Sequence, residues 1–263
     1  MRSNHEIDYK IFGEEMQYVE VELDPDETVL SESGSFMMMD EGITMSTILG
    51  DGSSQDTGLM GKLFSAGKRL LTGESLFMTA FTNVDSIKRK VSFASPYPGK
   101  IIALDLSELG GKVIAQKDSF LCAAKGVSIG IEFQRKLGTG LFGGEGFIMQ
   151  KLEGDGMTFV HAGGHVTKRV LAVGEKLKID TGCIVAFTSL IHYDIEFVKG
   201  IRNAIFGGEG LFFANLTGPG TVWIQTLPIS RLASKIVSYG GFAGKRKEEG
   251  SLLGGLGNLL DGN

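Results

Sequence analysis

A short glycine-rich loop occurs three times along the chain of 263 residues. The segment Leu141–Gly154 reads LFGGEGFIMQKLEG, the segment Ile205–Gly218 reads IFGGEGLFFANLTG, and a more divergent copy, LLTGESLFMTAFTN, spans Leu70–Asn83. A loop that is used three times is more typical of repeated architecture than of a single cofactor site. We therefore predict that the chain is built from three related units.

The similarity extends beyond these loops. The segment SFMMMDEGITM (Ser35–Met45) aligns without gaps with SFLCAAKGVSI (Ser119–Ile129), and GCIVAFTSLIHYDIEF (Gly182–Phe197) occupies the same place in the third unit. Each unit reads as strand, turn, strand, loop, Gly-Glu turn and strand. Units of this length bury little surface alone, so we expect an all-β protein of three tandem units, packed as a pseudo-threefold barrel-like sandwich or prism.

Composition agrees with many short strands, because the chain has 39 glycines, only 5 prolines and 42% apolar residues. Length alone allows one large or two small domains. The repeat favours one triplicated β domain over 1–238, with units of about 7–90, 91–156 and 157–227, and a flexible tail over 239–263. Helix is expected at Leu59–Leu71, within an insertion over 47–70, and as a short C-terminal helix at Pro228–Tyr239.

The charge balance argues against nucleic acid as a general partner. The formal net charge is −5, whereas binding to phosphate backbones requires a concentrated basic surface. The N-terminal MRSNHEIDYK contains no apolar segment, and no apolar run approaches the roughly 18 residues of a membrane span, so we expect a cytoplasmic protein. Cys122 and Cys183 lie in apolar, strand-like runs and are expected to be buried, reduced thiols.

Several longer segments carry a resemblance to a known family. They include DPDETVLSESGSFMMMD, SPYPGKIIALDLSELGG, FVHAGGHV, IFGGEGLFF and LTGPGTVWIQTLP, and the similarity covers roughly Ile7–Val237. The chain resembles the bacterial proteins related to the eukaryotic altered-inheritance-of-mitochondria protein 24. The resemblance implies three tandem copies of the fold of the tryptophan RNA-binding attenuation protein. It implies no catalytic residue, since that family has no established activity.

The segment that begins at Gly138 matches G-x-G-x-x-G, but the residues after it, GEGFIMQKL, read as a strand rather than the helix that a dinucleotide site requires. We therefore interpret the Gly-Glu pair that occurs in each of the three loops as a turn. In this turn glycine supplies backbone freedom and glutamate accepts hydrogen bonds from turn amides. The repeated turn motif consists of Gly73, Glu74, Gly144, Glu145, Gly208 and Glu209.

Equivalent positions in three units would bring Glu74, Glu145 and Glu209 together, where the carboxylates would need either basic partners or a cation. Arg69, Lys136 and Arg202 lie a few residues upstream in the respective units, so we favour ion-paired turns over a metal site.

The only local histidine pair is His161 and His165 in HAGGH. Two imidazoles four residues apart can share a metal on a helix, but the two glycines between them indicate a turn between strands. We therefore favour a structural role for both histidines and expect neither a metal site nor a cofactor.

These observations favour a non-enzymatic protein that forms homo-oligomers and acts as a scaffold or binds a protein partner or a membrane surface. The alternative is a small-molecule or RNA binding module like the attenuation protein, which rests on fold analogy. A metal-dependent enzyme is the third and weakest hypothesis. The chain contains no G-x-S-x-G nucleophile motif and no clear catalytic constellation that would support it.

Overall fold

The computed structural model describes residues 4–32, 34–49, 77–135, 147–197 and 212–239. All six residues of the repeated turn motif, the helix expected at Leu59–Leu71 and the tail from residue 240 lie outside these ranges. The part of the chain that is described consists mainly of strands, which confirms the all-β prediction.

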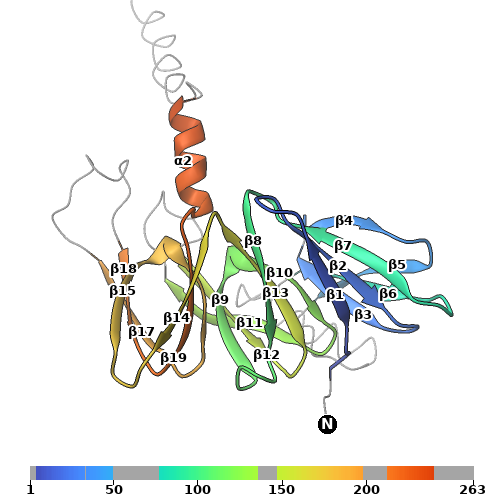
Figure 1. Cartoon of the computed structure of the whole chain (residues 1–263), viewed down its shortest axis with the longest axis horizontal. Helices are drawn as coiled ribbons and strands as arrows, with labels where there is room; N and C mark the ends of the chain where they lie inside the picture. Colours follow the sequence, from blue (N-terminus) through green and yellow to red (C-terminus); the bar gives the residue numbers. More distant parts are fainter. Residues whose placement is uncertain (1–3, 33, 50–76, 136–146, 198–211, 240–263) are drawn as a thin grey trace, which may run out of the picture.

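The strands form four antiparallel sheets, and within the described ranges none of them closes into a barrel (Figure 1). Sheet A has the order β1 (Asp8–Phe12), β2 (Tyr18–Leu23), β7 (Arg89–Ala94), β4 (Phe36–Met39). Sheet B has the order β5 (Ile43–Leu49), β6 (Phe77–Asn83), β3 (Thr28–Glu32), β10 (Phe120–Ala124), β13 (Met157–Gly163), β8 (Gly99–Asp105). Sheet C has the order β11 (Ser128–Arg135), β12 (Phe147–Glu153), β9 (Lys112–Gln116), β16 (Ile184–Thr188), β19 (Gly220–Gln225), β14 (Val166–Leu171). Sheet D has the order β15 (Lys176–Asp180), β18 (Phe212–Thr217), β17 (His192–Phe197).

Three hydrophobic cores lie between successive sheets. Val19 and Val91 of sheet A pack with Phe159 of sheet B in the first core. The second core joins sheets B and C and includes Leu30, Leu104, Val113 and Trp223. The third core joins sheets C and D and includes Ile114, Leu171, Ile195 and Leu216. Each core is therefore a two-sheet sandwich, and sheets B and C each contribute to two cores.

The strand patterns follow from burial. In β2 the apolar side chains of Val19, Val21 and Leu23 are fully buried and alternate with half-buried Tyr18, Glu20 and Glu22, as expected for a strand with one covered face. Strand β10 is buried along its whole length and has the continuous apolar sequence FLCAA. This difference arises because both faces of sheet B are covered, so that Phe120 and Ala123 of β10 pack in the second core and Leu121 and Cys122 pack in the first.

Two aligned turns require glycine. Gly42 follows β4 with a φ of 94°, and Gly126 follows β10 with a φ of 105°, a left-handed backbone region that favours glycine. The aligned segments SFMMMDEG and SFLCAAKG end on these glycines. The two aligned segments therefore end on the same kind of turn, which reverses the chain after β4 and after β10.

Single turns of 3-10 helix lie between consecutive strands at two places. The first (Lys117–Ser119) separates β9 from β10, and the second (Thr181–Cys183) separates β15 from β16. In the second turn the Asp180 carboxylate accepts a hydrogen bond of 2.9 Å from the Gly182 amide. These turns redirect the chain so that β9 and β10, and likewise β15 and β16, belong to different sheets.

Figure 1 shows the sheets arranged along the longest axis of the molecule, with the N-terminal strands β1 to β7 at one end and β15, β17 and β18 at the other. Helix α2 (Ile229–Tyr239) confirms the short C-terminal helix and projects away from the strands. Its first turn is anchored by an ion pair of 2.7 Å between Arg231 and Asp180.

Candidate functional site

The structure separates the two histidines of HAGGH. His161 lies on β13 and is 1% exposed, whereas His165 lies in the turn that follows and is exposed. The His161 ring packs edge-on against Tyr97, with 4.3 Å between the ring centroids. The two imidazoles therefore occupy different environments, one inside the protein and one at its surface.

Burial is the main cause of the low basicity of His161. Desolvation lowers its pKa to about 4, and the nearby backbone of Tyr97 acts weakly in the opposite direction. Neither ring nitrogen makes a hydrogen bond of regular geometry within the described part of the chain. His161 is thus a neutral, buried imidazole at neutral pH.

No group of three or more His, Cys, Asp or Glu side chains that could hold a metal ion occurs among the residues described. Cys122 is buried and Cys183 is half-buried, and both are free thiols. Desolvation raises the pKa of each thiol, which keeps it in the protonated, weakly nucleophilic form.

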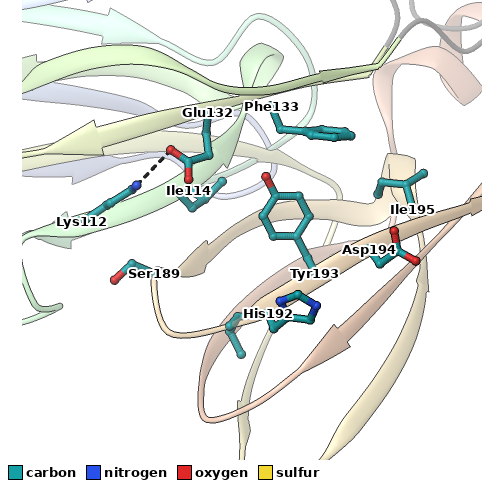
Figure 2. A pocket seen from close by; sticks show the side chains of 10 residues that line it. Lys112, Ile114, Glu132, Phe133, Ser189, His192, Tyr193, Asp194 and Ile195 are labelled. Atoms are coloured by element: carbon teal, nitrogen blue, oxygen red, sulfur yellow. Dashed lines mark hydrogen bonds and ion pairs between the residues drawn. The ribbon is translucent and has the colours of Figure 1, made fainter.

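A cavity of about 620 Å³ lies between sheets C and D, at the open side of the third core. Strands β9 and β11 of sheet C line one side, and β17 with the turn before it lines the other (Figure 2). The lining residues are Lys112, Ile114, Glu132, Phe133, Ser189, Ile191, His192, Tyr193, Asp194 and Ile195.

Aromatic and aliphatic side chains form the inner part of this cavity. The Tyr193 ring meets Phe133 edge-on, with 5.7 Å between the centroids, and lies 5.1 Å from the Phe187 ring. Ile114 and Ile191 are buried beside them. The cavity therefore offers an apolar inner surface of the kind that receives a small ring or alkyl group.

The outer part of the cavity is polar. Lys112 Nζ lies 2.9 Å from Glu132 Oε2 and 3.8 Å from Glu153 Oε1. Figure 2 shows the Tyr193 hydroxyl directed toward the side on which Glu132 lies. Burial, with a smaller contribution from the Glu132 charge, raises the pKa of Tyr193, so its hydroxyl stays protonated and can donate a hydrogen bond.

The sequence pattern does not predict this cavity, because HYDIEF by itself indicates only a strand. The signal was the alternation of polar His192 and Asp194 with apolar Tyr193 and Ile195 in one short segment. That pattern predicts a strand with one covered face, but it does not reveal which strand lies opposite.

A second notable surface is the free edge of sheet A. Strand β4 pairs with β7 and is the last strand of the sheet in the described ranges. All four of its apolar side chains are exposed, and the exposed fractions of Met38 and Met39 are 43% and 38%. Exposed apolar edge strands are uncommon on monomeric proteins, because they invite pairing with another strand.

Comparison with known proteins agrees with this all-β architecture. Residues 9–227 match the family described as mitochondrial biogenesis AIM24, and the chain belongs to that family. An uncharacterised protein from Streptococcus pyogenes serotype M6 is 32% identical over 226 residues, which cover 84% of this chain and 86% of that protein. A crystal structure of a Streptococcus pyogenes protein from a structural genomics programme superimposes with a TM-score of 0.68 at 25% identity, covering 89% of this chain and 99% of that one.

In the part of the chain described, no helix combines the length and apolar character needed to cross a membrane.

Proposed function

We propose that this protein is a non-enzymatic scaffold whose copies associate through the exposed edge of sheet A. The observation that carries the proposal is strand β4, which presents Phe36, Met37, Met38 and Met39 to solvent. Methionine side chains are flexible and polarisable, and they are frequent on surfaces that bind other proteins. Burial of this edge against a partner would remove apolar area from water and would satisfy the free backbone groups of the strand.

The test is native mass spectrometry of the purified full chain and of its Met38→Glu variant. The unmodified chain is expected to form an oligomer, and the variant is expected to dissociate to monomers, because a carboxylate cannot be buried at an apolar contact without a partner. Met16→Glu is the matched control, since Met16 is 56% exposed and lies between β1 and β2, away from this edge. A chain that is monomeric at micromolar concentration would contradict the proposal.

A triplicated architecture is a further part of this proposal, with three tandem units like the attenuation protein within one chain. The pairing of β6 with β3 and β5, of β12 with β9 and β11, and of β18 with β15 and β17 supports it. A second set supports it equally, because β7 pairs with β2 and β4, β13 with β8 and β10, and β19 with β14 and β16. Each strand number in these sets advances by six from one unit to the next.

Contact with a membrane surface or a protein partner is assigned in this proposal to α2. Its far end exposes Ile236, Val237 and Tyr239 to fractions of 60%, 51% and 86%. Co-sedimentation with phosphatidylcholine vesicles tests the membrane part, and the double variant with Ile236→Asp and Val237→Asp is expected to lose binding. Equal sedimentation of this variant and the unmodified chain would exclude α2 as the membrane contact.

A second candidate function is the binding of a small molecule in the cavity beside Tyr193. The observation that favours it is the combination of an apolar inner surface with a hydroxyl donor and the Lys112–Glu132 ion pair at the rim. The net charge of −5 favours a small ligand over RNA as the occupant. Native mass spectrometry of protein isolated from its host is expected to show a bound mass that Tyr193→Ala loses, and protein without such an adduct would count against this function.

A further inference from the structure

At two junctions inside the chain, a strand of one proposed unit pairs with a strand of the next unit in the same way. Strand β10 pairs antiparallel with β3, with Cys122 opposite Ser31 and Ala123 opposite Leu30. Strand β16 pairs antiparallel with β9, with Ala186 opposite Ala115 and Phe187 opposite Ile114. In both junctions the strand number differs by seven. The contact joins three strands on one side to three strands on the other and so completes a six-stranded sheet.

Strand β4 corresponds to β10 in the sequence repeat but has a different environment. Ser35–Met45 aligns with Ser119–Ile129, so Met38 takes the place of Cys122 and Met39 the place of Ala123. The residues of β10 are all buried, whereas those of β4 are all exposed. Two differences account for this: β10 has β3 beside it whereas β4 has no second partner among the described strands, and sheet B contributes to two cores whereas sheet A contributes to one.

Strand β15 is the complementary case at the other end of the molecule. It pairs with β18 as β3 pairs with β6 and β9 with β12, and it is the last described strand of sheet D. The pairs Ile179↔Ala214, Ala115↔Gln150 and Ser31↔Thr79 occupy matching places in the three sheets. Ile179 therefore corresponds to Ser31 and Ala115, the residues that face the incoming strand in the two internal junctions.

We propose that β15 of one copy pairs antiparallel with β4 of a second copy, with Met38 opposite Ile179 and Met39 opposite Lys178. This inference rests on the proposed scaffold function and names the partner of its exposed edge. The merged sheet would have the order β17-β18-β15-β4-β7-β2, followed by β1. Sheet B has the order β5-β6-β3-β10-β13-β8 and sheet C the order β11-β12-β9-β16-β19-β14, so the new sheet repeats the same scheme.

Charge complementarity supports this pairing. Strand β15 has the sequence Lys-Leu-Lys-Ile-Asp, with Lys176 and Lys178 exposed, and β4 is followed directly by Asp40 and Glu41. In the first internal junction the Lys125 amide donates to the Thr28 carbonyl at 3.1 Å, and the matching residues between copies are Glu41 and Lys176. Opposite charges placed across neighbouring strands are favourable, so the proposed register pairs acid with base.

The two edges lie at opposite ends of the long axis of the molecule, with β4 near one end and β15 near the other (Figure 1). A contact between different surfaces of identical chains is head-to-tail, so a dimer keeps one free β15 edge at one end and one free β4 edge at the other. Association therefore continues until a ring closes, or it produces a filament.

Engineered cysteines test the register directly. Cys183, which is half-buried, is first replaced by serine, and Met38→Cys and Ile179→Cys are then introduced singly and together. Residues directly opposite across antiparallel strands have Cα atoms about 4.5–5.5 Å apart, which suits a disulfide. Under mild oxidation the double variant is expected to give a ladder of linked chains. A mixture of the two single variants is expected to give linked dimers, and neither single variant alone should do so.

Ser31→Cys is the matched control inside the chain, because it places a cysteine opposite native Cys122 in the corresponding junction. Its intrachain disulfide verifies that this register permits bond formation. If this control forms and the Met38→Cys, Ile179→Cys chain stays unlinked, or links only within one chain, the pairing between copies is wrong. Native mass spectrometry of the same samples distinguishes the two failures. Oligomers without the disulfide contradict only this register, whereas monomers contradict the scaffold function as well.

Discussion

At the scale of single residues, His161 has the most unusual environment. It lies on β13 with 1% of its surface exposed, against the ring of Tyr97. Its pKa of about 4 lies below the ordinary 6.5 because protonation would create a positive charge at a buried site that water does not solvate. Below pH 6.5 the unfolded chain therefore binds a proton at this residue that the folded chain does not bind.

We predict that His161 makes stability fall on acidification. Its contribution is fully present above pH 6.5, declines as the pH falls and levels off near pH 4, with a total change of about 3 kcal/mol. His161→Phe keeps an aromatic ring but removes the titration. Urea unfolding at several pH values is expected to show a smaller loss for this variant between pH 6.5 and 4, and parallel curves for the two proteins would refute the assignment.

At the scale of elements, burial of a strand depends on its position in the sheet and on how many faces of that sheet are covered. Strands β4 and β10 align in sequence, yet the first lies at a sheet edge and the second in a sheet interior. β4 has large, adaptable side chains where β10 has the smaller Cys122 and Ala123. The two aligned strands therefore differ in side-chain size as well as in burial.

We predict that exchange of charges between Glu41 and Lys176 controls association. Glu41→Lys and Lys176→Glu each place like charges across the proposed contact, so each variant alone is expected to self-associate a few-fold more weakly than the unmodified chain. An equimolar mixture of both variants restores opposite charges at every contact of an alternating assembly. Sedimentation velocity is expected to show recovery only in the mixture.

Glu14→Lys is a suitable control for this experiment, since Glu14 is exposed between β1 and β2. This variant should associate like the unmodified chain, because its charge lies outside the proposed contact. A mixture that associates as weakly as its two components would show that Glu41 and Lys176 do not meet.

At the scale of the whole molecule, one side chain connects sheets B and C. The Gln225 side chain on β19 accepts a hydrogen bond of 2.8 Å from the Gly163 amide on β13 and donates one of 2.8 Å to the Gly182 carbonyl. Gln225 is almost fully buried, so no water replaces these contacts readily. It therefore links the two sheets of the middle sandwich.

We predict that Gln225→Leu lowers the free energy of unfolding by about 2 kcal/mol, because a buried amide and a buried carbonyl each lose a partner. Thr167→Val on the adjacent strand β14 is the control, since Thr167 is exposed and its loss should change stability by less than about 0.5 kcal/mol. Urea denaturation measures both changes, and equal midpoints for the two variants would contradict this role of Gln225.

The strands of this protein were predictable from local pattern, but the cavity was not. Alternation in YVEVEL and the buried run FLCAA identify β2 and β10, and Pro228–Tyr239 identified α2 within one residue. The cavity depends on β11 and β17, which belong to different sheets and approach one another only in the third sandwich. No residue spacing in the sequence indicates that these two strands lie close together.

The sequence by itself determined the strand content, the chain reversals at Gly42 and Gly126 and the family, because these depend on local backbone preferences and on similarity along the chain. Only the tertiary structure decided that, among the described strands, the sheets stay open and β4 lies at an edge, and that His161 is buried away from His165. These features depend on which strands meet across long sequence separations. Pairing partners 80 or more residues apart, such as Leu30 and Ala123, are selected by packing of the whole chain rather than by local pattern.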